Sequence, residues 1–546
     1  MKKILAFLLV AMFVLVSVTG CGGNNTTPQA NDESNTSGTN KEVTKKEIEV
    51  PSEPQDGGVL TIALVASPKN LDPVKYTGTY ESQIIQNVGD TLVAYSMDLS
   101  EIIPNLAKSW TVSEDGKHYT FQLRDDVYFH PGKFQDGRQM TAEDVKYSLE
   151  RSHELSAMNR LDMIESVEVV NDFEVIVHLP EPNAAFLTAL TNSGNIIVPK
   201  EEVEGWGDDF GNHLIGTGPF MLKEFKLDEE AVLVRNDNYW AQKPHLDGVV
   251  FKVITDINQN ANALRTGEID FSSGLSGEAV KIIREDENIR LLEMPGLHVA
   301  YIYFNQVKGP TADIRVREAL IKAIDTKELV KGVYQYGEAQ PASLPLPPGS
   351  WGYDASLESI VPEYNPEEAK KLLAEAGYPD GFKTTLYISN TPHRVKMATI
   401  VQQYLNMNLN VDVDIQTSEW GTFSEIGSSG NADIFAMSWT WYPDPFFFLN
   451  KIFASDAIGS LGNGQGFSNP EVDRLLAEAL VVSEQEERAE LYKQALKIIV
   501  EQHPGIFYSN ENVTWGVAPE VQGLVQRADG CIFLTNTEVN VWKVQK

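Results

Sequence analysis

Cysteine and positive charge are scarce in this sequence, and each shortage excludes a class of protein. Two cysteines among 546 residues exclude a disulfide-stapled scaffold and a zinc site built on thiolates. The 44 lysine and arginine residues face 77 acidic ones, and a formal charge of −33 argues against a nucleic-acid partner. With 42% hydrophobic and 22% charged residues, the composition excludes a disordered chain and a polytopic membrane protein. The length predicts about three or four domain-sized units.

Motifs of catalysis and metal binding are missing as well. There is no His-Glu-x-x-His, no Gly-x-Ser-x-Gly, no Walker loop and no dinucleotide fingerprint. The nine histidines are scattered, and no two stand at i, i+3 or i+4 spacing. We therefore expect no enzyme activity, no cofactor and no metal site, although a pair of glycosidase carboxylates could hide among the many acids.

The first residues predict export and a lipid anchor. Lys2 and Lys3 precede residues 4–18, an apolar stretch that is shorter than the roughly 20 residues of a spanning helix. Val18-Thr19-Gly20-Cys21 resembles the lipobox of bacterial lipoproteins, in which the chain is cut before the cysteine and the sulfur carries a diacylglycerol. This resemblance implies a signal peptide over residues 1–20 and a palmitate-type membrane anchor on Cys21. The alternative is an ordinary secretory signal with a chance cysteine.

A flexible tether follows this cysteine. Residues 22–54 are rich in Asn, Thr, Ser, Gly, Glu and Lys and contain no aromatic side chain, so they cannot bury enough apolar surface to fold. We assign residues 21–56 to the lipidated cysteine and its tether. Cys531 is then the one cysteine left as a thiol, and the apolar residues after it predict a buried and inert side chain.

Strand and helix signals alternate through the rest of the chain. Residues 59–65 form an apolar run typical of a strand, and a variant capping box at Thr141 predicts a helix to about residue 150. Asn365 followed by Pro366 predicts a helix that ends at Gly377. A second Asn-Pro start at residue 469 opens a long helical pattern with a break near residue 483. Mixed signals of this kind predict α/β lobes with antiparallel additions.

Several blocks resemble one family of transport proteins. They occur in this order: Leu71-Asp72-Pro73; Ala107-Lys108-Ser109-Trp110; Tyr119-Thr120-Phe121; Thr141-Ala142-Glu143-Asp144; Gly216-Thr217-Gly218-Pro219; Arg265-Thr266-Gly267-Glu268; Tyr442-Pro443-Asp444-Pro445. Together they resemble the peptide/nickel-type (family 5) extracytoplasmic solute-binding proteins of bacterial ABC transporters, over about residues 57–546.

The resemblance implies a periplasmic-binding-protein type II-like α/β fold, in which two lobes close around a ligand by a hinge. An extra domain is inserted in the N-terminal lobe, and Trp110, Tyr119 and Phe121 are expected in its core. The implied divisions are lobe I at 57–96, 213–301 and 512–546, the inserted domain at 97–212, and lobe II at 302–511.

The two charged anchors that peptide-binding members of this family use are in doubt here. The aspartate that holds the peptide amine aligns with Trp441, one residue before Tyr442. The arginine of dipeptide binders has no direct counterpart, although Arg394 stands a few positions away. Asp444 is either a ligand for an amine or the cap of the following helix. Because a buried charge needs a partner, this departure should change the choice of cargo.

Aromatic side chains offer other contacts to a cargo. Trp420, Trp439 and Trp441 present flat faces that suit sugar rings, apolar side chains or a cation, and at least one of them is expected in the core. The family resemblance places Tyr303 and Asn305 at the border of the cleft. The three phenylalanines at 446–448 are expected mainly in the core.

The sequence therefore predicts a monomeric, lipid-anchored solute-binding protein on the extracytoplasmic face of the cell membrane. It would capture an oligopeptide, dipeptide or similar small solute and deliver it to an ABC permease. The alternatives are a receptor for an oligosaccharide or other metabolite, a peptide-sensing surface protein, and a surface hydrolase.

Overall fold

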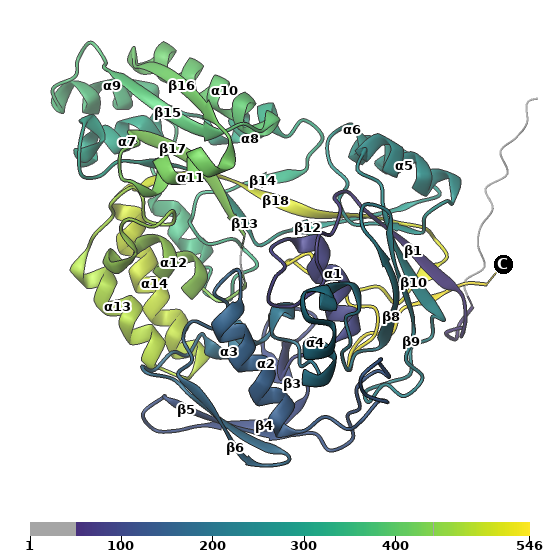
Figure 1. Ribbon diagram of the computed structural model, residues 1–546. Helices are drawn as coiled ribbons and strands as arrows, with labels where there is room; N and C mark the ends of the chain where they lie inside the picture. Colours follow the sequence, from purple (N-terminus) through teal and green to yellow (C-terminus); the bar gives the residue numbers. More distant parts are fainter. Residues whose placement is uncertain (1–50, 441, 546) are drawn as a thin grey trace, which may run out of the picture. The chain divides into compact units, whose positions relative to one another are not determined.

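The computed structural model describes residues 51–440 and 442–545, which form a mixed α/β architecture (Figure 1). Their strands are β1 (Val59–Leu64), β2 (Val93–Tyr95), β3 (Ile102–Pro104), β4 (Ala107–Val112), β5 (His118–Leu123), β6 (Ser166–Asn171), β7 (Glu174–His178), β8 (Phe220–Lys226), β9 (Glu230–Arg235), β10 (Gly248–Val253), β11 (Phe271–Ser272), β12 (Arg290–Pro295), β13 (His298–Phe304), β14 (Ala339–Pro341), β15 (Lys383–Ser389), β16 (Asp412–Ser418), β17 (Ile434–Thr440), β18 (Gly505–Val517), β19 (Val521–Gln522) and β20 (Trp542–Lys543). Their α-helices are α1 (Thr79–Val88), α2 (Ala142–Leu155), α3 (Phe186–Leu190), α4 (Lys200–Trp206), α5 (Ile257–Thr266), α6 (Glu278–Arg284), α7 (Ile314–Lys322), α8 (Thr326–Val333), α9 (Pro366–Glu375), α10 (Pro392–Leu409), α11 (Trp420–Ser428), α12 (Phe446–Phe453), α13 (Pro470–Val481) and α14 (Gln485–Glu501).

One long strand connects two halves of the largest sheet. The order is β16-β15-β17-β13-β18-β11-β1-β10-β9-β8, with β12 and β14 paired to β18. Strand β18, in yellow in Figure 1, pairs with β14 up to Glu511 and with β12 from Asn512 onward. The backbone passes from one half of the sheet to the other within β18, between Glu511 and Asn512. It also passes at Gly296 and Leu297, between β12 and β13, because β13 pairs with β17 of the second half along its whole length. The expected lobe boundary at 301/302 therefore falls inside β13.

Each half has its own apolar core. Phe251 on β10 and Trp515 on β18 are fully buried in the core of the first half. In the second half, the sheet is covered on both faces, and alternate residues of β13 point to different cores: Tyr301 and Tyr303 to one, Ile302 to the other. Each half therefore has its own core although both share β18, as expected for two bodies that only a few backbone segments connect.

A further core lies under the four-stranded sheet β4-β5-β7-β6. Tyr119 and Phe121 are buried there as predicted, and Trp110 packs against the same core while partly exposed. Antiparallel pairing of β5 with β7 also places His118 beside His178, with 2.8 Å between their Nδ1 atoms. Sequence spacing could not reveal this histidine pair, because 60 residues separate its members.

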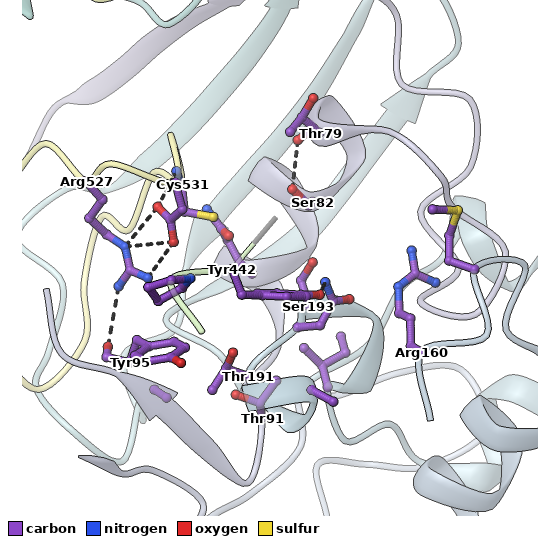
Figure 2. A pocket seen from close by; sticks show the side chains of 18 of the residues that line it. Thr79, Ser82, Thr91, Tyr95, Arg160, Thr191, Ser193, Tyr442, Arg527 and Cys531 are labelled. Carbon is purple, nitrogen blue, oxygen red and sulfur yellow. Dashed lines mark hydrogen bonds and ion pairs between the residues drawn. The ribbon is translucent and has the colours of Figure 1, made fainter. Parts of the chain in front are cut away.

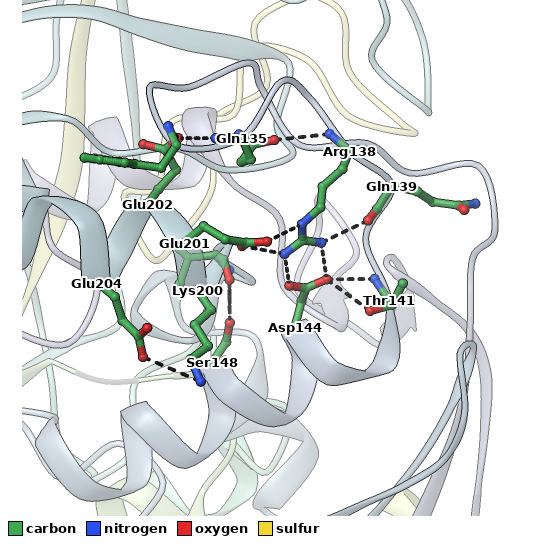
Figure 3. A network of polar contacts seen from close by, with 12 residues as sticks. Gln135, Arg138, Gln139, Thr141, Asp144, Ser148, Lys200, Glu201, Glu202 and Glu204 are labelled. Atoms are coloured by element: carbon green, nitrogen blue, oxygen red, sulfur yellow. Dashed lines mark hydrogen bonds and ion pairs between the residues drawn. The ribbon is translucent and has the colours of Figure 1, made fainter.

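An ion-pair network fixes the loop before α2 to α4 (Figure 3). The Arg138 guanidinium lies 2.6 Å from Asp144 and 2.7 Å from Glu201. Asp144 also accepts a bond from the backbone N–H of Thr141, which completes the predicted capping box. The fully buried Glu202 carboxylate accepts the N–H of Phe134 at 2.6 Å. This part of the recognisable sequence block is therefore structural.

The predicted helix starts are accurate. The Asn365 side chain accepts the N–H of Glu368 at 3.1 Å, and Gly377 has φ +98 just after α9. The long pattern after residue 469 is indeed broken, between α13 and α14. The helix predicted for residues 141–150 continues to Leu155. Among the described residues, no helix is both long and apolar enough to cross a bilayer.

Candidate functional site

A cavity of about 500 Å³ is the candidate site, and it is built from distant parts of the chain. The segments that contribute lining residues are 76–95, 103–105, 158–163, 189–196, 440–451 and 527–537. The segment 440–451 begins at the last residue of β17, in the second half of the large sheet. The other segments lie in the parts of the chain before β13 or after β18. A cavity of this volume is within the range of small-molecule sites.

Tyr442 crosses the cavity and contacts the opposite wall. Its hydroxyl accepts a hydrogen bond from the side-chain amide of Asn192. The same amide group's oxygen accepts a bond from the Tyr76 hydroxyl at 3.0 Å, and Tyr76 also lies 2.6 Å from the Ser193 hydroxyl. Burial raises the pKa of both Tyr76 and Tyr442, so these phenols stay neutral and serve as hydrogen-bond groups.

A buried ion pair and a thiol form another part of the wall (Figure 2). Arg527 and Asp529 are 2.6 Å apart, and Asp529 also accepts the backbone N–H of Cys531 at 2.9 Å. Although burial disfavours its charge, the Arg527 guanidinium holds the pKa of Asp529 below its usual range. Burial raises the pKa of the Cys531 thiol. The sequence predicted an inert, buried cysteine, whereas the structure places it half-buried on the cavity wall.

Asp90 is a second acid on this wall. Its carboxylate accepts hydrogen bonds from the hydroxyls of Thr217 and Tyr239 at 2.9 and 3.0 Å, and from the Trp240 indole at 3.0 Å. Burial away from water raises its pKa despite these three donors. These three hydrogen bonds hold the Asp90 carboxylate in a fixed position on the cavity wall.

Of the residues predicted from sequence to contact cargo, the structure brings Tyr442 to the cavity. Asp444 lies just behind it and is fully buried. Its carboxylate is 2.9 Å from the Arg488 guanidinium and accepts the N–H of Phe446 at 2.9 Å, in the first turn of α12. Asp444 therefore binds the start of α12 and an arginine, although the N-cap position of the helix is Pro445. Phe446 is buried as expected and also lines the cavity.

Tyr303 and Asn305 lie away from the cavity. Tyr303 is fully buried and stacks on Tyr301, with ring centroids 3.9 Å apart. The Asn305 amide donates to the carbonyls of Gly430 and Ala432 at 3.0 and 2.9 Å. A side chain bonded in this way fixes a loop of its own half, and it has no donor left for a solute.

The remaining predicted contacts are dispersed. Arg394, at the start of α10, donates to the Ala436 carbonyl and to the Ser438 hydroxyl at 3.0 and 2.9 Å. Trp420 is 54% exposed at the start of α11, and Trp439 packs partly buried against a core of the second half. None of these three is on the cavity wall among the described residues. Trp441 and Cys21 lie outside the described residues.

A conservative variant separates the two roles open to Tyr303. Its hydroxyl, like that of Tyr301, has no hydrogen-bond partner among the described residues. Because an unsatisfied buried hydroxyl costs free energy, Tyr303→Phe should leave stability unchanged or raise it by up to about 1 kcal/mol. It should leave cargo affinity unchanged. The checks are urea unfolding and a binding titration, and a drop in affinity at unchanged stability would restore Tyr303 as a contact.

Sequence reasoning missed most of the cavity wall. Tyr76, Arg160, Asn192 and Arg527 carry no local motif, and the first and last of them are 451 positions apart in the chain. Only the recognisable block at 442–445 gave a signal near the site. In the described residues, no cluster of three or more His, Cys, Asp or Glu side chains is arranged to hold a metal ion.

The cavity combines segments of both halves of the protein, and the comparison with known families gives its class. The chain belongs to the bacterial extracellular solute-binding proteins, family 5, whose model (family 5 Middle) matches residues 101–460. These are binding proteins of transporters and not enzymes, which confirms the prediction that this chain is not an enzyme. The α/β, two-lobed fold class of periplasmic binding proteins type II is confirmed too.

Named relatives extend over most of the chain. It is 33% identical over 480 residues to heme-binding protein A of Haemophilus influenzae, covering 83% of this chain and 87% of that protein. It is 31% identical over 488 residues to the dipeptide-binding protein of Escherichia coli, covering 84% and 90%. The solved structure of HbpA2 from Haemophilus parasuis superposes with a TM-score of 0.82 at 30% identity and covers 89% of this chain and all of that one.

Proposed function

We propose that this protein is a lipid-anchored extracytoplasmic receptor that captures a peptide or similar small solute and delivers it to an ABC permease. The observation that carries this proposal is the cavity of about 500 Å³ whose wall combines segments of both halves of the protein. Membership of family 5 and the likeness to a dipeptide-binding protein support a peptide as cargo. The likeness to a heme-binding protein keeps other small solutes within the proposal.

The divisions proposed for this function are lobe I at 57–96, 213–295 and 512–546, the inserted domain at 97–212, and lobe II at 298–511. Capture would close the lobes around the cargo, with Tyr442 of lobe II meeting Asn192 of the inserted domain. A bound solute stabilises the closed form, so release requires a permease that favours the open form.

The anchor is proposed on Cys21, after removal of residues 1–20. Diacylglycerol on the cysteine supplies the two acyl chains that stable membrane attachment requires. Residues 22–56 would hold the body near the membrane, where its permease lies. Metabolic labelling with a palmitate analogue tests this directly: the wild-type chain should be labelled and Cys21→Ser should not.

Native mass spectrometry of the full-length chain, purified in detergent without denaturation, tests the cargo. We expect added masses that fragment to amino acids. Hexose losses, or one discrete non-peptide mass, would contradict a peptide cargo, and a deletion strain with unchanged peptide uptake would contradict delivery. A lost cellular response with normal uptake would instead favour a peptide-sensing role.

Cys531 provides a reporter inside the proposed site. It lines the cavity, and its raised pKa predicts slow alkylation even before cargo binds. A bound peptide should slow the labelling of Cys531 by about tenfold or more, because the occupied cavity must open before the maleimide can reach the thiol. The rate of maleimide labelling, read by peptide mapping, measures this, and Cys531→Ser identifies the signal. Equal rates with and without peptide would place the cargo elsewhere.

A further inference from the structure

The acids on the cavity wall leave little capacity for a positively charged cargo group. Asp529 is paired with Arg527 at 2.6 Å, and Asp90 is held by three hydrogen-bond donors. The third acid, Asp162, is exposed to solvent. An exposed carboxylate keeps its water, so an ion pair with it contributes little. Recognition of a cargo ammonium by this wall is therefore weak.

Arg527 is the partner of Asp529, but Arg160 on the same wall has no acidic partner among the described residues. Arg160 is half-buried, and it donates to the Tyr76 carbonyl at 2.7 Å, to the Ser156 hydroxyl at 3.2 Å and to the Pro73 carbonyl at 3.4 Å. All three acceptors are uncharged, and no carboxylate of the described residues lies within ion-pair distance of Arg160. A guanidinium removed from water without an anion is costly, and its planar fork matches a carboxylate. Figure 2 shows it on the side of the view opposite Arg527 and Cys531.

Arg160 is also held in place before any cargo arrives. Its guanidinium lies 4.1 Å from the ring centroid of Tyr76, a cation–π contact. The backbone of Gly194 also leaves room for the Arg160 side chain: a Cβ there would lie 2.5 Å from Cδ and 2.6 Å from Nε of Arg160. The turn that carries Gly194 is fixed by the Asn192 side chain, which accepts the Gly194 N–H at 2.8 Å. Such pre-organisation lowers the entropic cost of binding an anion.

A second cation lies on the wall that belongs to the other half. Lys451, in the last turn of α12, has its ammonium 5.3 Å from the ring centroid of Phe446. Like Arg160, it has no carboxylate partner within ion-pair distance in the described part of the chain. Lys451 is exposed and keeps its water, so its charge contributes little to recognition. Arg160 is therefore the half-buried cation of this wall without an acidic partner, whereas the buried acids of the wall are already paired or hydrogen-bonded.

We propose that the cargo is an acid, and that its carboxylate or equivalent anionic group binds the Arg160 guanidinium. This deepens the proposed function and rests on it. The acid group carries the recognition, a free amine on the cargo contributes little, and the apolar body of the cargo lies against the aromatic wall formed by Tyr76, Tyr442, Phe446 and Phe447. N-acylated as well as free peptides are therefore accepted, and neutral or C-terminally blocked ones are rejected.

Binding of one tripeptide in four forms to the full-length chain tests this proposal. The probes are Ala-Phe-Ala with free ends, with an acetylated amine, with an amidated carboxyl, and with both blocked. Amidation should weaken binding by about tenfold or more, and acetylation should change it by less than about threefold. In Arg160→Gln the effect of amidation should disappear, while Arg160→Lys should retain part of it.

Two further variants separate charge from position. Gly194→Ala keeps the charge but displaces Arg160, so the free acid should lose affinity and the amide should not. Arg474→Gln changes the net charge equally on exposed α13, and it should preserve the full difference between acid and amide. Equal binding of acid and amide, or a difference that survives in Arg160→Gln, overturns the acid anchor and leaves the peptide receptor standing. Binding of none of the four forms overturns the acid anchor and contradicts a peptide cargo.

Discussion

Replacing Arg488 by Met should destabilise the protein by about 3–5 kcal/mol, because it leaves the Asp444 carboxylate buried without its partner. The two side chains are 6% and 1% exposed and 2.9 Å apart. Arg488 also donates to the Ala479 carbonyl at 3.0 Å, so its loss leaves a second buried acceptor unsatisfied. Urea unfolding followed by circular dichroism measures the change in the free energy of unfolding.

Two controls define what this result means. The exposed Arg474, paired with Glu471 at 2.8 Å, offers a matched substitution, and Arg474→Met should cost less than about 1 kcal/mol. Combining Arg488→Met with Asp444→Leu removes both charges and should recover part of the loss. If Arg488→Met is as mild as the exposed control, the ion pair is not structural. If Asp444→Asn instead weakens binding at unchanged stability, the sequence prediction of Asp444 as a cargo contact returns.

Acid should destabilise the protein through His130, by about 3 kcal/mol in total. This histidine is 1% exposed, and its Nε2–H donates to the Gly218 carbonyl at 2.8 Å. Its Nδ1 atom has no hydrogen-bond partner among the described residues, so a proton there would be a buried, unpaired charge. Burial accordingly lowers the pKa of His130 to about 4.

Proton linkage gives the direction in which the free energy of unfolding changes with pH. The unfolded chain binds a proton at the ordinary histidine pKa of about 6.5, and the folded chain only near 4. Stability is therefore complete above pH 6.5 and falls as the pH decreases from 6.5 toward 4. His130→Gln should flatten this slope relative to the wild type in urea unfolding at each pH. Identical slopes for the wild type and His130→Gln would refute the assignment.

Local features of the fold were predictable from sequence because they depend on neighbours in the chain. Asn365 caps α9 through an N–H three residues away, and Thr141 and Asp144 form a capping box within a single turn. The family resemblance added the lobes and the inserted domain, which no local pattern could provide. The boundary it implies at 301/302 lies inside β13, and the backbone passes from β12 to β13 at 296–297, a position set by strand pairing far apart in the chain.

The cavity could be predicted only in part, for a physical reason. The sequence prediction placed contacts between residues 439 and 444 and also at Tyr303, Asn305, Arg394 and Trp420. Of those that the structure describes, Tyr442 lies on the wall. Arg160 escaped notice since its significance lies in what surrounds it: neutral acceptors, the ring of Tyr76 and the space above Gly194. Whether a charged side chain has an ion-pair partner depends on its neighbours in the folded chain, and the sequence does not show it.

The segment at 527–537 is synthesised after every other part of the cavity wall, and this order has a consequence for biosynthesis. A nascent chain that has already produced Tyr76 and Arg160 still lacks the Arg527–Asp529 side of the pocket. Strand β11 also awaits β18, its partner from more than 240 residues downstream. A chain that is still being synthesised therefore has an incomplete cavity wall. We expect a solute to bind only to finished molecules.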